Sequence, residues 1–104
     1  MNQEDVKEEV RSRNDIVDVV AQYVRLQQAG GVHKGLCPFH KEKTPSFNVD
    51  TRRQAFHCFG CGEGGDAFAF IMRIEGVDFP TALQMLGKRV GMDVEPQRGP
   101  GDKG

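Results

Sequence analysis

The sequence predicts a small α+β domain: a zinc ribbon, which is an antiparallel β-sheet holding one metal ion, flanked by N-terminal and C-terminal helices. Three observations predict this class. Two pairs of metal ligands have the spacing of a structural zinc site, short alternating segments lie between them, and helical periodicity precedes and follows them. A chain of 104 residues has room for one modest core, which a bound metal would help to hold.

The predicted ligands are Cys37 and His40 in one C-x-x-H pair, and Cys58 and Cys61 in one C-x-x-C pair, separated by residues 41–57. Ligands three apart lie on one side of a tight turn, so each pair supplies two neighbouring corners of a tetrahedron. Four protein ligands leave no position for a catalytic water. The single zinc ion is therefore expected to be structural.

The chain has two other histidines, His33 and His57. On an extended strand, the side chain of His57 would point to the opposite face from that of its neighbour Cys58. His33 precedes Cys37 by four positions and lies outside the ligand turn. Only His40 completes a two-residue gap, so it is the expected fourth ligand.

Other uses of the cysteines fit less well. A disulfide framework needs an even number of cysteines and an oxidising compartment, whereas this chain has three and begins without a secretory apolar stretch. A thioredoxin-like redox motif would leave Cys37 and His40 unexplained. No run of about 18 apolar residues occurs, so no membrane association is expected. Thiols used as ligands predict a reducing compartment, the cytoplasm.

Residues 2–24 are predicted to form two helices. Val6 and Val10 lie four apart on the first, and Asn14 is expected to cap the second, with acidic residues in its first turn. The second helix has an apolar stripe of Ile16, Val17, Val20, Tyr23 and Val24. Packing on the ribbon is the commoner use of such a stripe, and a partner surface is the alternative.

The ribbon itself is predicted from turns and alternation. Residues 23–26 are expected to be extended, Gly30 and Gly31 form a turn, and residues 32–36 lead into the first ligand pair. Residues 46–50 and 55–58 alternate between apolar and polar side chains and are expected to pair across a polar turn at 51–54.

Two further helices are predicted after the second ligand pair, from residues 66–75 and 78–90. The glycines at 62, 64 and 65 are expected to be loop, Asp66 and Asp78 are the expected caps, and Gly76 and Gly91 the expected stops. The zinc-binding domain is taken to span residues 1–94. Residues 95–104 are rich in Pro and Gly and predict a linker or frayed tail towards a further domain.

Positive charge is concentrated on the ribbon. Residues 25–61 carry six lysines and arginines against Glu42 and Asp50, whereas residues 1–24 and 62–104 are each net acidic. Such a patch suits weak contact with a phosphate backbone, and ordinary solvation is an equally supported alternative. The candidate DNA-binding residues are Arg25, Lys34, Lys41, Lys43, Arg52, Arg53 and His57.

Aromatic residues between and beside the ligands offer a second kind of contact. Phe39, Phe47, Phe56 and Phe59 are of the type that stacks on single-stranded bases. A ribbon this small has little else apolar to bury, so most of the four are expected to belong to the core.

The blocks LCPFHKEKTPSFNV and FHCFGCGEGGDAFAF, followed by IEG, closely resemble the N-terminal zinc-binding domain of bacterial DnaG-type replicative DNA primases. The likeness runs from about residue 15 to residue 94. It implies a zinc ribbon that contacts the single-stranded DNA template and helps to choose where an RNA primer begins during DNA replication. In such primases, a separate nucleotidyltransferase domain binds Mg²⁺ and polymerises RNA as a DNA-directed RNA polymerase. A further C-terminal domain binds the replicative helicase of the primosome. Neither domain has a counterpart among these 104 residues.

One segment departs from the family pattern. Similar domains usually carry several basic residues and an aromatic ring just before the first ligand pair, where this chain has Gln27, Gln28, Gly31, Val32 and His33. Only Arg25 and Lys34 are basic there. The expected DNA contact therefore shifts towards Lys41, Lys43, Arg52 and Arg53.

The expected function is that of a template-binding module that acts with a primase catalytic domain in cis or in trans. The alternative is a zinc-ribbon protein-interaction module without nucleic-acid binding, which the acidic flanks and apolar helices favour. A free-standing enzyme is disfavoured because the acidic residues are scattered along the sequence. The chain alone is expected to make no primer.

Overall fold

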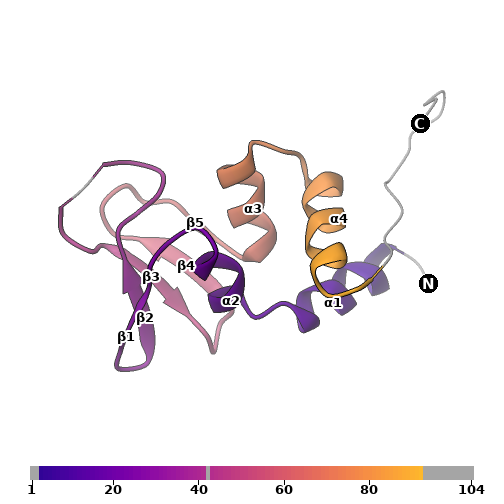
Figure 1. Ribbon diagram of the computed structural model, residues 1–104, viewed down its shortest axis with the longest axis horizontal. Helices are drawn as coiled ribbons and strands as arrows, with labels where there is room; N and C mark the ends of the chain where they lie inside the picture. The colour runs from indigo at the N-terminus through magenta and orange to yellow at the C-terminus, as the bar shows by residue number, and fades with distance from the viewer. Residues whose placement is uncertain (1–2, 42, 93–104) are drawn as a thin grey trace.

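Two helices precede a five-stranded antiparallel sheet, and two helices follow it (Figure 1). The computed structural model describes residues 3–41 and 43–92. The first two helices are α1 (Gln3–Arg13) and α2 (Ile16–Ala21), and the last two are α3 (Ala67–Glu75) and α4 (Phe79–Arg89). The predicted tail at 95–104 lies outside the described residues.

The strands pair in the order in which they occur in the chain, so the sheet is a simple meander. They are β1 (Gln27–Ala29), β2 (Val32–Gly35), β3 (Phe47–Asp50), β4 (Ala55–Cys58) and β5 (Gly64–Gly65). Along β3 and β4, buried and more exposed residues alternate, as expected of strands with one face on a core. The predicted α+β class, with a ribbon between flanking helices, is confirmed.

The sheet differs from the sequence prediction at its two edges. Tyr23 and Val24 are not extended, because their backbone N–H groups both donate to Val20 O and prolong the last turn of α2. The edge strand β1 begins only at Gln27. At the opposite edge, Gly64 and Gly65 form β5 rather than a loop, pairing with Phe56 and His57 of β4 through their backbones.

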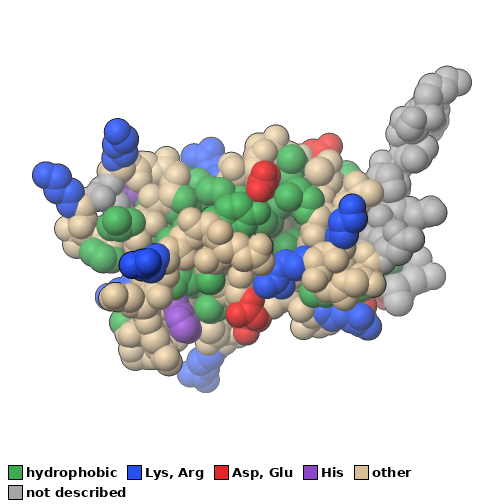
Figure 2. Space-filling model, in the orientation of Figure 1, with side chains coloured by type: hydrophobic (Ala, Val, Ile, Leu, Met, Phe, Trp, Pro, Cys, Tyr) green, Lys and Arg blue, Asp and Glu red, His purple; other side chains and the backbone are tan. Residues whose placement is uncertain are grey.

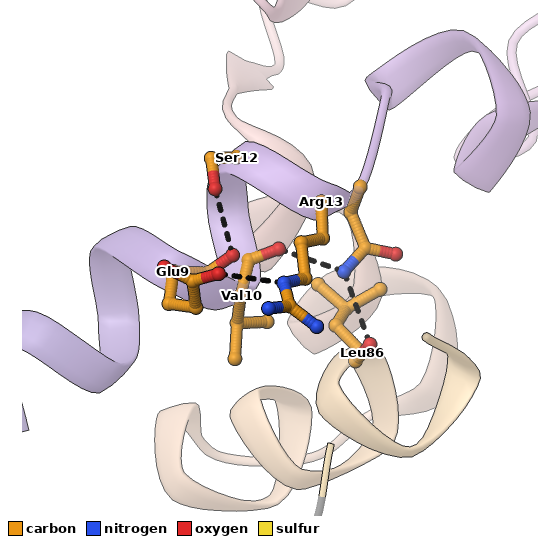
Figure 3. A network of polar contacts seen from close by, with 6 residues as sticks. Glu9, Val10, Ser12, Arg13 and Leu86 are labelled. Atoms are coloured by element: carbon orange, nitrogen blue, oxygen red, sulfur yellow. Dashed lines mark hydrogen bonds and ion pairs between the residues drawn. The ribbon is translucent and has the colours of Figure 1, made fainter. Parts of the chain in front are cut away.

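The predicted cap of α2 is wrong by one residue. Asp15 is the N-cap, and its side chain accepts a hydrogen bond from Val17 N at 3.0 Å. Asn14 is instead buried, and its side-chain amide donates to Val10 O at 2.8 Å and to Leu86 O at 3.0 Å; Figure 3 shows these bonds reaching both carbonyls. The Asn14 side chain therefore caps the last turn of α1 and ties it to α4.

Both carbonyls are available because of the way the helices end. The backbone N–H of Asn14 donates to Arg11 O, and that of Val90 donates to Gly87 O. In an uninterrupted helix these N–H groups would have bonded Val10 O and Leu86 O. Arg89 completes the arrangement, since its guanidinium donates to Asn14 Oδ1 at 3.1 Å.

A single core joins the inner face of the sheet to the helices. The apolar stripe of α2 packs on β3 of the ribbon, as predicted, and also on α3, with Ile16 and Val20 fully buried. The rings of Phe39, Phe47, Phe56 and Phe70 form one cluster, with centroids 5.3–6.1 Å apart. Tyr23 adds an edge contact to Phe70 at 5.7 Å. Aromatic pairs at such separations stabilise beyond simple area burial.

The C-terminal helices begin and end as predicted. Asp66 caps α3 by accepting from Ala69 N at 2.9 Å, and Asp78 caps α4 by accepting from Thr81 N at 3.1 Å. Gly76 ends α3 in the left-handed conformation at φ 67°, which glycine adopts without a Cβ penalty. Among the helices that the structure describes, none is both long and apolar enough to cross a membrane.

Candidate metal centre

The sheet brings the two ligand pairs together. Cys37 and His40 lie in the turn after β2, and Cys58 and Cys61 lie at the end of β4 and in the turn that follows. Gly35, Phe47 and Cys58 are aligned across β2, β3 and β4, so both turns leave the same end of the sheet. The pairing of the strands thus places residues 37–40 next to residues 58–61.

The four side chains form one compact cluster. One ligand atom from each of Cys37, His40, Cys58 and Cys61 lies within 4.8 Å of all the others. Cys37 Sγ and Cys61 Sγ are 3.8 Å apart. Zn–S bonds of about 2.3 Å in a tetrahedron place two sulfurs about 3.8 Å from each other. The cluster therefore has the dimensions and the donor set of a zinc site, and His33 and His57 take no part in it.

The electrostatics of the thiols favour a bound cation. Burial raises the pKa of Cys37 to about 12, opposed by the N–H of Phe39 and reinforced by the neighbouring sulfurs of Cys58 and Cys61. Burial also raises the pKa of Cys58, but hydrogen bonds from the N–H groups of Cys61 and Gly60, together with those from the Cys37 and Cys61 thiols, lower the pKa overall. Thiolates are the form that binds metal. Because neighbouring thiolates repel, a divalent cation bound between them favours the deprotonated form that binds metal.

The first ligand of each turn, Cys37 or Cys58, is buried. The second ligand is more accessible: His40 is half-buried and Cys61 is exposed. In the first turn, the backbone N–H of Phe39 donates to Cys37 Sγ at 3.4 Å. In the second, Gly62 takes a φ of 84° and donates to Cys58 O at 2.8 Å. A residue with a Cβ would be strained at that φ.

Four of the predicted DNA-binding residues border two neighbouring apolar hollows beside the first turn. Arg25 and Lys34 line a groove of about 400 Å³, and Lys41 and Lys43 line an open hollow of about 800 Å³. Leu36 and Pro38 line both, so the two hollows adjoin each other. We call them together the basic groove. Tyr23 and Pro45 complete its first part.

The remaining candidates lie on β4 and on the turn that precedes it. Arg53 and His57 line a pocket of about 180 Å³ with Asn48, Asp50 and Phe59. The rings of His57 and Phe59 meet edge to face at 4.5 Å. Arg52 is exposed on the turn 51–54, while the guanidinium of Arg53 lies 3.8 Å from the Asp50 carboxylate. We call this hollow the outer pocket.

One row of the sheet connects the two regions. Lys34, Asn48 and His57 are directly aligned across β2, β3 and β4, and Lys34 also lines the basic groove. On the face shown in Figure 2, lysine and arginine side chains project from the ribbon end, whereas the helical part carries both basic and acidic side chains. On this face, the ribbon end is therefore mainly basic and the helical part is mixed in charge.

Aromatic residues divide as the composition suggested. Phe47 and Phe56 are buried and Phe39 is half-buried, whereas Phe59 is 72% exposed. Sequence reasoning missed Asn48 in the outer pocket, and Tyr23 and Leu36 in the basic groove. The position of Leu36 could have been predicted to lie near the site, because it is an apolar residue directly beside a predicted ligand. Nothing in the sequence around Asn48, a polar residue in a strand, indicated that it lines a pocket.

The fold and the cluster define the class of this protein: it is a small zinc-binding domain of the zinc-ribbon type, with a Cys-His-Cys-Cys site at one end of an antiparallel sheet. The CHC2 zinc finger family matches residues 2–100, and the chain belongs to that family. This confirms the resemblance to the zinc-binding domain of bacterial DNA primases.

Individual relatives agree. A DNA primase of Geobacillus stearothermophilus is 52% identical over 91 residues, which cover 88% of this chain and 15% of the relative. A DNA primase of Mycolicibacterium smegmatis is 55% identical over 86 residues, covering 82% of this chain and 14% of the relative. A crystal structure of the Aquifex aeolicus primase, containing zinc-binding and RNA polymerase domains, matches with a TM-score of 0.82 and 41% identity, over 86% of this chain and 22% of that one. The chain thus spans about a seventh of the curated relatives' length.

Proposed function

We propose that this chain is the template-binding domain of a bacterial primase, which contacts single-stranded DNA and helps to select the start site of RNA primers. Cys37, His40, Cys58 and Cys61 hold one structural zinc ion, which supplies the cross-link that fixes the two turns. The observation that carries the proposal is the position of the basic candidates: four line the basic groove beside the ligands, and Arg53 lines the outer pocket.

Contact with DNA divides between phosphate and base. Lysine and arginine side chains along the basic groove pair with phosphates, which positions the strand without reading its sequence. The exposed rings of Phe59 and Tyr23 offer stacking surfaces. Asn48 Oδ1 is buried and has no hydrogen-bond partner within the described residues. Asn48 also lines the outer pocket, so a rotation of its side-chain amide would let this oxygen accept from the exocyclic amine of a base that enters the pocket.

The domain contributes positioning rather than chemistry. In residues 3–41 and 43–92, the only group of three or more potential metal ligands is the Cys-His-Cys-Cys cluster. Nucleotidyl transfer needs carboxylates that hold Mg²⁺ against nucleotide phosphates, and these belong to a catalytic domain that acts with this one in cis or in trans. Holding the template in the correct register lowers the entropic cost of initiation. A contact with the replicative helicase would run through another part of the full-length protein, in the cytoplasm.

Titration of labelled single-stranded DNA at several salt concentrations tests the DNA contact. Two to four phosphate contacts predict a slope of log K against log salt of about −1.5 to −3, at about −0.7 per contact. Replacing Lys34 and Lys43 with Gln should flatten the slope and weaken binding, and so should Arg52→Ala with Arg53→Ala. Lys88→Gln, an exposed change on α4, is the matched control and should leave the slope unchanged.

Start-site selection is tested by reconstitution. The zinc-loaded chain, added in trans to a primase catalytic domain that lacks its own zinc-binding domain, should restore start-site choice and dinucleotide formation. The metal-stripped chain should not. If the loaded chain leaves start sites unchanged and binds no DNA, the protein-interaction alternative is favoured, with the apolar part of the basic groove as its contact surface.

A further inference from the structure

Arg73 on α3 contacts both halves of the metal site. Its guanidinium Nη2 lies 3.0 Å from Glu63 Oε2, and its Cζ lies 5.4 Å from the centroid of the Phe39 ring. Phe39 stands between the ligands Cys37 and His40, and Glu63 follows Cys61 by two residues. One exposed side chain thus bridges the turn after β2 and the turn after β4.

Each contact is one step from a sulfur ligand. The backbone N–H of Phe39 donates to Cys37 Sγ at 3.4 Å. The carbonyl of Glu63 accepts from the backbone N–H of Cys58 at 2.8 Å. Groups that surround a metal ligand in this way set its orientation and influence how firmly the metal is held.

We infer that Arg73 is a positioning residue for the zinc site, which clamps the two ligand turns together and slows the opening that releases the ion. The inference rests on the proposed zinc site. Zinc can leave only when ligands of one turn separate from those of the other. The ion pair with Glu63 and the cation–π contact with Phe39 both oppose that separation.

A role in general stability would look different. An exposed ion pair within one helix contributes little to the free energy of unfolding. Its loss should not affect the zinc site more than the rest of the domain. The chain offers such a pair as a control, because Arg13 Nε lies 2.6 Å from Glu9 Oε2 on α1 (Figure 3). Its two side chains are 52% and 37% exposed, against 52% and 38% for Arg73 and Glu63.

The test is the rate of zinc transfer from the loaded 104-residue chain to a large excess of a chromophoric chelator, 4-(2-pyridylazo)resorcinol, with the melting temperature of each variant measured in parallel. Arg73→Gln should accelerate release about threefold to tenfold, as expected for loss of a cation–π contact and an ion pair. Arg13→Gln should change the rate less than about 1.5-fold, the small effect expected of an exposed pair away from the site.

Two further variants separate the contacts. Glu63→Gln should accelerate release, and adding it to Arg73→Gln should give less than the product of the two single effects, because the residues act as a pair. Arg73→Lys keeps the charge but loses the planar group over the ring, so its release rate should lie between those of the wild type and Arg73→Gln.

The outcomes are distinct. A wild-type chain that binds no zinc would overturn both the proposed metal site and this inference. Stoichiometric zinc with equal release rates for wild type and Arg73→Gln would overturn the inference alone. So would equal acceleration by Arg73→Gln and Arg13→Gln, since that pattern reports general destabilisation.

Discussion

Replacing Asn14 with Ala should be among the most damaging single changes in the helical part of this domain. The side chain is 1% exposed and satisfies two backbone carbonyls, Val10 O and Leu86 O. Ala leaves both without this donor, in residues that are 0% and 2% exposed. At about 1–3 kcal/mol for each buried group left unsatisfied, partly relieved by local adjustment, we expect a loss of about 2–4 kcal/mol.

That loss is large for a domain of this size, whose total free energy of unfolding is expected to be about 5–15 kcal/mol. Urea unfolding followed by circular dichroism, with zinc in excess throughout, measures it as a shift of the midpoint at constant slope. Ser12→Ala is the matched control. Ser12 lies on the same turn of α1 and donates to Glu9 O from an exposed position (Figure 3), so its loss should cost less than about 0.5 kcal/mol.

A value for Asn14→Ala within about 0.5 kcal/mol of the Ser12→Ala value would refute the reasoning, because surface changes already produce differences of that size. It would mean that both carbonyls find water or other donors once the amide is removed. The capping of the two helix ends would then be incidental to stability.

Four further changes have definite expected outcomes. Cys61→Ser should lower the metal content from one zinc per chain and loosen the ribbon, because zinc sites of this kind bind with about 10–16 kcal/mol; metal analysis and far-ultraviolet circular dichroism follow both, and a variant that keeps stoichiometric zinc would contradict the ligand set. Gly35→Ala should destabilise by about 1–3 kcal/mol in urea unfolding, since its Cβ would lie 2.6 Å from a backbone oxygen of the segment before β1; a neutral effect would show that this segment moves freely. Phe59→Ala should leave stability within about 0.5 kcal/mol while single-stranded DNA binding weakens by about 1–3 kcal/mol, and unchanged binding would remove this ring from the proposed interface. Hydrogen bonds from Thr81 lower the pKa of Asp78. The stability that this carboxylate contributes is therefore present above its unfolded pKa of about 3.9 and is lost as the pH falls through the lower folded value. Asp78→Ala should flatten the dependence of unfolding free energy on pH in that range, and an unaltered profile would mean that other acidic residues cause the dependence.

The parts of this fold that sequence could predict are those set by local rules. The ligand pairs could be predicted because two ligands separated by two residues lie on one side of a tight turn and can bind the same metal ion. Strands β3 and β4 were readable because Phe47, Val49 and Phe56 alternate with polar residues. The caps at Asp66 and Asp78 could be predicted because each acidic residue precedes an apolar periodic run. In the structure, each side chain accepts a hydrogen bond from the backbone N–H three residues later.

The parts that could not be predicted depend on contacts distant in the chain or made by backbone alone. Asn is a residue type that often caps helices, so the sequence at position 14 suggests an N-cap. Its actual role depends on a tertiary contact, because the Asn14 amide donates to Leu86 O of α4 and so connects two helix ends. Strand β1 is exposed along its whole length, so no hydrophobic alternation marks it. Strand β5 is two glycines, whose pairing with β4 involves no side chain. The division of the basic residues between the basic groove and the outer pocket likewise follows from the register of the sheet.

The aromatic cluster gives the domain an optical property. The chain contains one tyrosine and no tryptophan, so its intrinsic near-ultraviolet emission is dominated by the single ring of Tyr23. That ring touches Phe70, and Phe70 touches Phe39 at 5.7 Å, within the turn that carries Cys37 and His40. Tyr23 also donates to the Glu75 carboxylate at 2.7 Å, a contact that depends on how α2 sits on α3. Because these rings connect Tyr23 to the turn that carries Cys37 and His40, we expect the tyrosine emission of the unlabelled protein to change when the metal is removed.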